Sequence, residues 1–151
     1  MTALDVGCGM GFFTIPLARL VGDAGGVIAL DLQPEMLAGL ARRASAAGCA
    51  NIVAQPARST SLDIDAWAGA VDFVLIFYML HEVPDQSRLI SQVYAALKPG
   101  GTILFAEPIV HVARRDFDRS LELLVEAGLS VIARPGIPIS RAVVLRKPAA
   151  R

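Results

Sequence analysis

Three glycines stand within five positions of the N-terminal segment, at Gly7, Gly9 and Gly11, between an apolar run and a stretch of helical periodicity. Glycine lets the backbone turn tightly and approach a ligand closely. Dinucleotide-binding loops space their glycines as G-x-G-x-x-G and hold a pyrophosphate. Here the spacing is G-x-G-x-G, and Asp5 precedes the first glycine by two residues. A carboxylate at the mouth of the loop repels a pyrophosphate, so the pattern favours a positively charged ligand. The alternative is a tight strand-to-helix turn that binds no ligand.

A second acidic residue, Asp31, ends the apolar run of residues 26–31. A carboxylate in this position can accept two hydrogen bonds from the hydroxyl groups of a ribose. Asp31 follows Gly11 by twenty positions (31 − 11), a separation that also suits a nicotinamide dinucleotide. Asp31 therefore indicates a nucleoside ligand without deciding which one.

The residues suited to proton transfer follow a later apolar run, residues 71–78. His81 is the side chain best suited to exchange a proton near neutral pH, and we expect Glu82 to orient its imidazole. A histidine that only caps a helix or packs in the core is the alternative. Glu107 and His111 follow the next apolar run, so they are predicted to face the same cleft.

Composition excludes several classes of protein. The 151 residues predict one domain, and 14 basic and 14 acidic residues cancel, so neither nucleic acid nor a membrane surface is indicated as a partner. The apolar runs are too short to span a bilayer. The N-terminus lacks the basic leader of an export signal, which predicts a cytoplasmic protein. Two cysteines and two histidines make no zinc-binding cluster, so we expect neither a metal nor a disulfide.

Apolar runs alternate with helical stretches along the chain. Helical periodicity begins at Pro34, recurs over residues 90–97, and recurs again from Phe117 to Gly128, where that helix is predicted to end. Strands are predicted at residues 2–6, 26–31, 51–55, 71–78, 102–108, 129–133 and 141–146. This alternation is typical of an α/β fold with a doubly wound, mostly parallel sheet and helices on both faces. Ligands of such sheets bind at the carboxyl ends of the strands, where the glycine loop lies.

The combined pattern resembles the class I S-adenosylmethionine-dependent methyltransferases over nearly the whole chain. "LDVGCGMG" is similar to the first motif of that family, "VIALDLQPEML" to its second strand, and "VDFVLIFYMLHEVPD" through "LKPGG" to its fourth strand and the turn before the fifth. The resemblance implies a seven-stranded sheet of order 3-2-1-4-5-7-6 with an antiparallel seventh strand. It also implies S-adenosylmethionine as the cofactor and S-adenosylhomocysteine as its product.

The resemblance assigns roles in cofactor binding. Gly7 and Gly9 give the backbone access to the methionine portion, and Asp31 holds the ribose. Leu32 and Met36 are candidates to wall the adenine, although Met36 also fits the core face of its helix. The remaining cofactor-binding candidates are Asp5, Cys8, Gly11, Arg58, Ser59 and Phe77. Cys8 is interpreted as a small, buried loop residue rather than a reactive thiol.

One departure from the family pattern follows the third strand. Many members have an acid followed by alanine there, and the acid binds the adenine amine, whereas this chain has Arg58 and Ser59. Arginine cannot accept a hydrogen bond. Either backbone groups near Arg58 and Ser59 bind the adenine, or the affinity for the cofactor is weakened. A solvated loop charge is the simpler interpretation of the arginine itself.

Three functional hypotheses follow. The leading one is methyl transfer to a small-molecule acceptor, with His81 as the catalytic base, by a single domain over residues 1–151 without an N-terminal cap. The second is a non-catalytic S-adenosylmethionine-binding or partner subunit, and the third is an NAD-dependent oxidoreductase, which the glycine spacing disfavours. The arginines within residues 114–119 fit an acidic substrate, but a solvated helix face is favoured. The identity of the acceptor stays open, and so does a homodimer.

Overall fold

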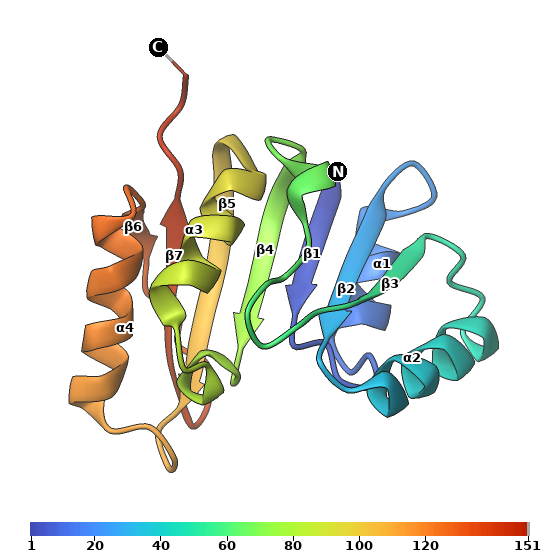
Figure 1. Cartoon of the computed structure of the whole chain (residues 1–151), viewed down its shortest axis with the longest axis horizontal. Coiled ribbons are helices and arrows are strands. Elements are labelled where there is room, and N and C mark those ends of the chain that lie inside the picture. Colours follow the sequence, from blue (N-terminus) through green and yellow to red (C-terminus); the bar gives the residue numbers. More distant parts are fainter. Residues whose placement is uncertain (151) are drawn as a thin grey trace.

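The computed structural model describes residues 1–150 of the chain. Its strands are β1 (Thr2–Val6), β2 (Gly26–Asp31), β3 (Ile52–Pro56), β4 (Val71–Phe77), β5 (Leu97–Pro108), β6 (Ser130–Ala133) and β7 (Ser140–Arg146). They form one sheet of order β3-β2-β1-β4-β5-β7-β6. β1 to β5 pair in parallel, and β7 runs antiparallel to both β5 and β6. The predicted fold class and strand order are confirmed (Figure 1).

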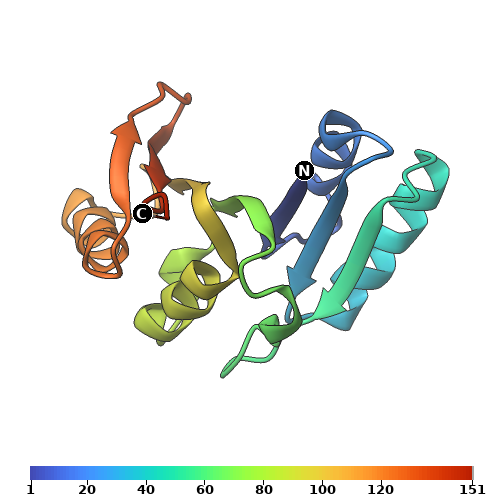
Figure 2. The same ribbon diagram turned by 90° about the horizontal axis from the view of Figure 1, so that it is seen from above.

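Helices cover both faces of this sheet. The α-helices are α1 (Thr14–Val21), α2 (Pro34–Ala46), α3 (Gln86–Ala96) and α4 (Arg114–Glu126), and two 3-10 helices are η1 (Asp65–Trp67) and η2 (Leu80–Glu82). α1 and α2 lie on one face, and α3 and α4 on the other (Figure 2). The 3-10 helices were not predicted, because three residues carry no periodic signal. Within residues 1–150, no helix is long and apolar enough to cross a membrane.

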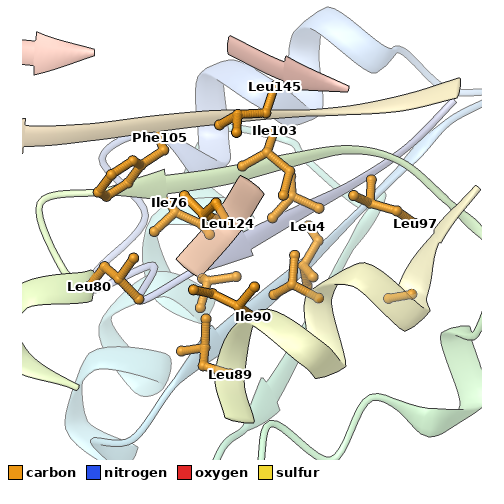
Figure 3. Close-up of a cluster of buried hydrophobic side chains, with 14 of the residues drawn as sticks. Leu4, Ile76, Leu80, Leu89, Ile90, Leu97, Ile103, Phe105, Leu124 and Leu145 are labelled. Carbon is orange, nitrogen blue, oxygen red and sulfur yellow. The ribbon is translucent and has the colours of Figure 1, made fainter. Parts of the chain in front are cut away.

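The main core lies between the sheet and the pair α3 and α4. Leu4, Ile76 and Ile103 from the strands belong to it with Ile90 of α3 and Leu124 of α4 (Figure 3). Each of these five side chains is at most 1% exposed. Burying one such side chain contributes roughly 1.5–3 kcal/mol relative to exposure. This packing fixes the carboxyl ends of β1, β4 and β5, where the residues suited to chemistry follow.

A smaller core on the opposite face holds the glycine loop. Leu40 of α2 packs there with Cys8 and Ile15. Gly11 has a φ of 88°, and a Cβ at this position would collide with the side chain of Leu40. Gly11 therefore serves the packing of the loop against α2, and its lack of a side chain needs no ligand to explain it.

The structure shifts several predicted boundaries, and two of these shifts have a clear physical cause. β5 begins at Leu97, although helical spacing placed that residue on the helix before it. The apolar Leu97 fits the pattern of a helix and that of a strand. It is fully buried and pairs with Val71, so tertiary packing makes it part of β5. β4 ends at Phe77, one residue before the predicted end, because Tyr78 has a φ of 61° and leaves the strand.

Candidate functional site

The glycine loop, residues 7–11, connects β1 to the segment that enters α1. The backbone amides of Gly7 and Cys8 both donate to the carbonyl oxygen of Leu30, at 2.8 Å each. Gly9 has a φ of 54°, and nothing lies within 4 Å of the position that its Cβ would occupy. Gly7 instead faces the side chain of Met79. The loop thus leaves open space at Gly9, which fits a ligand that lies against the backbone.

Asp31 ends β2 directly beside this loop. One carboxylate oxygen accepts a hydrogen bond from the amide of Gly9 at 2.9 Å, and the other accepts one from the amide of Gln33 at 2.9 Å. These bonds fix the orientation of the carboxylate, and each oxygen retains a second lone pair. The arrangement fits the predicted role of Asp31 as the acceptor of two ribose hydroxyl groups.

A cavity of about 350 Å³, the first cavity, lies at the carboxyl ends of β1 and β2. The structure brings five predicted cofactor residues into its lining: Gly7, Asp31, Leu32, Arg58 and Ser59. The opposite wall consists of residues 82–85 and one side of α3, none of which was predicted to bind the cofactor. The predicted ribose and adenine residues therefore share one cavity.

Gln92 of α3 is the clearest of the missed residues. Its side-chain oxygen accepts a hydrogen bond from the amide of Leu62 at 3.0 Å, and its side-chain nitrogen donates to the Ser61 hydroxyl at 3.0 Å. Gln92 thereby holds the segment that follows β3, against which the adenine is expected. Apolar periodicity marks only the core face of a helix, so the sequence carried no signal for a polar residue on its side.

The side chain of Arg58 is engaged by a neighbouring acid. Its guanidinium lies 2.7 Å from the carboxylate of Asp63, and the two side chains are 71% and 37% exposed. The hydrogen bond from Arg58 lowers the pKa of Asp63. The backbone amides of Ser59 and Thr60 make no hydrogen bond within residues 1–150. The structure therefore leaves backbone donors available at this point of the cavity.

Asp5 lies beneath the glycine loop rather than at its mouth. It is 3% exposed and accepts a hydrogen bond of 2.6 Å from the hydroxyl of Thr14. Burial raises the pKa of Asp5 to about 6, the bond from Thr14 opposes this shift, and the charge of Asp31 adds to it. One carboxylate beneath the loop and one beside it make the local potential negative. This field favours a cationic ligand and disfavours a pyrophosphate.

Three further candidates lie outside the lining of the first cavity. Cys8 is buried, and burial raises the pKa of its thiol to about 12, in line with a small packing residue. Met36 is half-buried in the first turn of α2. Phe77 is also half-buried, and its ring centre lies 4.5 Å from that of Phe13 and 4.3 Å from that of Tyr78. Phe77, the last residue of β4, thus packs between the residue that precedes α1 and the residue that follows β4.

His81 belongs to η2, shortly after β4, and pairs with Glu107 at the end of β5. Its Nδ1 lies 2.7 Å from one carboxylate oxygen of Glu107, and its backbone amide donates to the other at 3.0 Å. The Glu107 side chain is 2% exposed, and burial raises its pKa. Glu82, the predicted partner, is 76% exposed and lies 3.9 Å from Nε2 of His81.

The prediction that Glu82 orients the imidazole was therefore wrong, because Glu107 does so. Consecutive side chains of a 3-10 helix diverge by about 120°, so neighbours such as His81 and Glu82 point in different directions. Glu107 reaches His81 from an adjacent parallel strand instead. The expectation that Glu107 faces the same cleft as His81 was wrong, because Glu107 is buried and supports the imidazole from inside the protein.

A second cavity, of about 620 Å³, lies between η2 and α4. Its lining includes the predicted residues His81 and His111, and Arg119 of α4. Residues 83–85 line both cavities, so the two cavities adjoin along this segment. His81 opens into the second cavity, while its neighbour Glu82 lines the first.

Comparison with known proteins identifies the family. The family described as Methyltransferase domain matches residues 3–101, about two thirds of the chain. The chain therefore belongs to the methyltransferase domain family. S-adenosylmethionine is the cofactor that this family implies, and the open space at Gly9 beside the fixed carboxylate of Asp31 fits it.

Similar curated proteins carry a more specific name. The demethylmenaquinone methyltransferase of Shouchella clausii (strain KSM-K16) is 36% identical over 106 residues, which are 70% of this chain and 44% of the relative. The protein of that name from Oceanobacillus iheyensis is 32% identical over 106 residues, with the same coverage. This chain therefore spans less than half the length of these relatives.

Solved structures confirm the fold that the resemblance implied. A SAM-dependent methyltransferase from Aquifex aeolicus superposes with a TM-score of 0.84 at 22% identity, covering 97% of this chain and 81% of that one. A SAM-dependent methyltransferase from Methanosarcina mazei gives 0.76 at 18% identity, covering 99% and 93%. The [4+2]-cyclase SpnF gives 0.83 at 19% identity, covering 99% and 75%. Since a cyclase shares this architecture, the fold alone does not define the reaction, and the residues of the site must do so.

Proposed function

We propose that this chain transfers the methyl group of S-adenosylmethionine to a small-molecule acceptor. The observation that carries the proposal is the carboxylate of Asp31, fixed by the amides of Gly9 and Gln33 at the rim of the first cavity. The curated relatives support the kind of acceptor, since their name specifies demethylmenaquinone, a small molecule. The negative field of Asp5 and Asp31 favours the sulfonium and ammonium of this cofactor over NAD.

In this proposal the first cavity binds the adenosyl part of the cofactor. Asp31 accepts hydrogen bonds from the ribose hydroxyls, Leu32 covers the adenine, and the backbone amide of Ser59 donates to the adenine ring. Gly7 and Gly9 leave room for the methionine part. When bound, the cofactor supplies a methyl group activated by a positively charged sulfur.

The catalytic residue in this proposal is His81. In-line methyl transfer needs an acceptor held close to the methyl group and aligned with it, and no covalent intermediate with the protein. Where the acceptor carries a proton, a base must remove it, and histidine suits this role at neutral pH. His81 lies just beyond the end of β4, and its side chain is 29% exposed and lines the second cavity.

Calorimetric titration with S-adenosylhomocysteine and with NAD tests the cofactor assignment. We expect binding of S-adenosylhomocysteine and none of NAD. Tighter binding of NAD would overturn the proposal. A screen of small acceptors, including 1,4-naphthoquinol, then follows the release of S-adenosylhomocysteine with and without cell extract. Turnover on small molecules alone supports catalysis, and binding with turnover only in extract favours the partner-subunit alternative.

A further inference from the structure

The second cavity contains one positive charge without an ionic partner. Arg119 lines the cavity and makes no ion pair within residues 1–150. Two carboxylates line it as well, but each is engaged elsewhere. Asp85 accepts a hydrogen bond of 3.0 Å from an amide at the start of α3, and Asp116 lies 3.5 Å from the guanidinium of Arg115. Arg119 is therefore the charged side chain of this lining that has no partner within residues 1–150.

His81 presents one particular nitrogen to this cavity. Glu107 occupies both its backbone amide and its Nδ1, which leaves Nε2 as the exposed nitrogen. A carboxylate that accepts a hydrogen bond from Nδ1–H leaves the lone pair of a neutral imidazole on Nε2. The other ionisable groups around the ring are Glu82 at 3.9 Å from Nε2, and His111, Asp85, Asp116 and Arg119 along the cavity.

This arrangement selects among the possible methyl acceptors by their protonation state. A thiolate or a carbanion needs no base, because it reaches the site already ionised. A hydroxyl group must lose its proton as it is methylated, and its oxygen gains negative charge while it does so. A lone pair on Nε2 meets the first requirement, and the unpaired charge of Arg119 meets the second. An ammonium group, in contrast, would gain nothing from the positive charge of Arg119, because its own charge has the same sign.

We propose, building on the methyl-transfer function above, that the second cavity receives an acceptor with a protonated hydroxyl group, and that Glu107 positions His81 to take its proton. The O–H proton moves to Nε2 as an electron pair of the oxygen forms the new bond to the methyl carbon. The electron pair of the broken S–CH₃ bond stays on sulfur and leaves S-adenosylhomocysteine. The carboxylate of Glu107 stabilises the resulting imidazolium, and the proton then passes to solvent.

Nitrogen NMR of the histidine rings tests the positioning role directly. The chain contains two histidines, so a His111→Asn variant assigns both sets of signals. We expect the Nδ1–H tautomer for His81 in the wild type. In Glu107→Gln the amide group donates to Nδ1, so the proton should move to Nε2. Glu82→Gln should leave the tautomer unchanged. An Nε2–H tautomer in the wild type overturns the inference, even where Glu107→Gln fails to fold.

Turnover tests the class of acceptor. The probes are catechol, 1,4-naphthoquinol, thiophenol and benzylamine, each with S-adenosylmethionine. We expect transfer to the two hydroxyl compounds and a fall in kcat of roughly 10²-fold or more in Glu107→Gln, with KM within about threefold. Glu122→Gln, an exposed change on α4, is the matched control and should keep wild-type turnover.

The outcomes separate this inference from the function on which it rests. Preferential transfer to thiophenol or benzylamine, or full turnover in a folded Glu107→Gln variant, overturns the inference alone. Failure to bind S-adenosylhomocysteine, or no transfer to any of the four probes, overturns the proposed function as well. A lower kcat with a shifted pH profile in Glu107→Gln supports the positioning role, since a merely structural loss would not move the profile.

Discussion

The two cavities that adjoin along residues 83–85 are built in different ways. The first is set by backbone geometry, with the glycine loop reaching it at Gly7 and the carboxylate of Asp31 held by two amides. The second depends on ionisable side chains, above all the pair of His81 and Glu107. A site made of backbone is encoded in short contiguous motifs. A site made of side-chain pairs depends on which strands lie side by side.

The replacement His81→Ala has the largest expected effect and separates the two cavities most clearly. Turnover should fall by roughly 10²–10⁴, the usual contribution of a general base, while affinity for S-adenosylhomocysteine stays unchanged. Steady-state kinetics and calorimetry measure the two quantities. The loss should shrink at high pH, where the acceptor ionises unaided. A parallel loss of cofactor affinity or of folding would return the histidine to a packing role.

The replacement Asp31→Ala tests the first cavity in the same way. Affinity for S-adenosylhomocysteine should weaken by about 1.5–3 kcal/mol, the usual contribution of hydrogen bonds to a charged group. The fold should change little, because Asp31 lies at a strand end and is half-buried. Calorimetry measures the change, with Asp23→Ala, an exposed acid in a turn, as the matched control. Wild-type affinity in Asp31→Ala would place the ribose elsewhere.

The replacement Asp5→Asn tests the electrostatics beneath the glycine loop. The pKa of Asp5 is about 6 in the folded chain against an ordinary value of 3.8, so its contribution to stability is greatest below pH 4 and is lost as the pH rises through 6. The free energy of unfolding of Asp5→Asn, relative to that of the wild type, should therefore increase between pH 4 and pH 7.5 by at most about 3 kcal/mol.

Urea denaturation of both proteins at the two pH values measures this difference. The same variant should bind S-adenosylhomocysteine more weakly at pH 7.5, because it lacks the buried negative charge. A stability difference that does not vary with pH would show that Asp5 titrates normally. Greater stability together with weaker binding would indicate that the chain keeps a destabilising carboxylate for its ligand.

The replacement Gln92→Ala should have a smaller effect on the first cavity. It removes two hydrogen bonds to the segment after β3, each with a net contribution of about 1 kcal/mol. Affinity for S-adenosylhomocysteine should fall by roughly 5- to 10-fold because the adenine wall loosens. Ser91→Ala, an exposed change on the same helix, is the control. Unchanged binding in Gln92→Ala would mean that the loop holds its position without α3.

The smallest effect is expected for Arg58→Ala. The guanidinium pairs with Asp63 at the surface, and exposed ion pairs contribute little. Binding of S-adenosylhomocysteine should stay within about threefold of the wild type by calorimetry. A larger loss would show that the arginine side chain turns inward and contacts the adenine, for example by stacking its planar guanidinium.

The sequence predicted the strands, the family resemblance implied their order, and five of the predicted cofactor residues line the first cavity. The sequence allowed this because Asp31 and the three glycines lie within contiguous motifs, and because a buried parallel strand such as β4 carries a continuous apolar run. It could not find the pairing of His81 with Glu107, which are 26 residues apart in sequence. Their contact depends on β4 and β5 being neighbours, and no local spacing records it. Gln92 could not be predicted either, because it acts through hydrogen bonds to residues that are distant in the sequence.

The wall shared by both cavities, residues 83–85, has a thermodynamic consequence. If a ligand in one cavity displaces this wall, it changes the affinity of the other, and linkage requires the effect to be equal in both directions. An acceptor that tightens cofactor binding tenfold must itself bind tenfold more tightly to the cofactor-loaded protein. Acceptor titrations with and without S-adenosylhomocysteine would then measure the coupling free energy between the two cavities, which residues 83–85 would transmit.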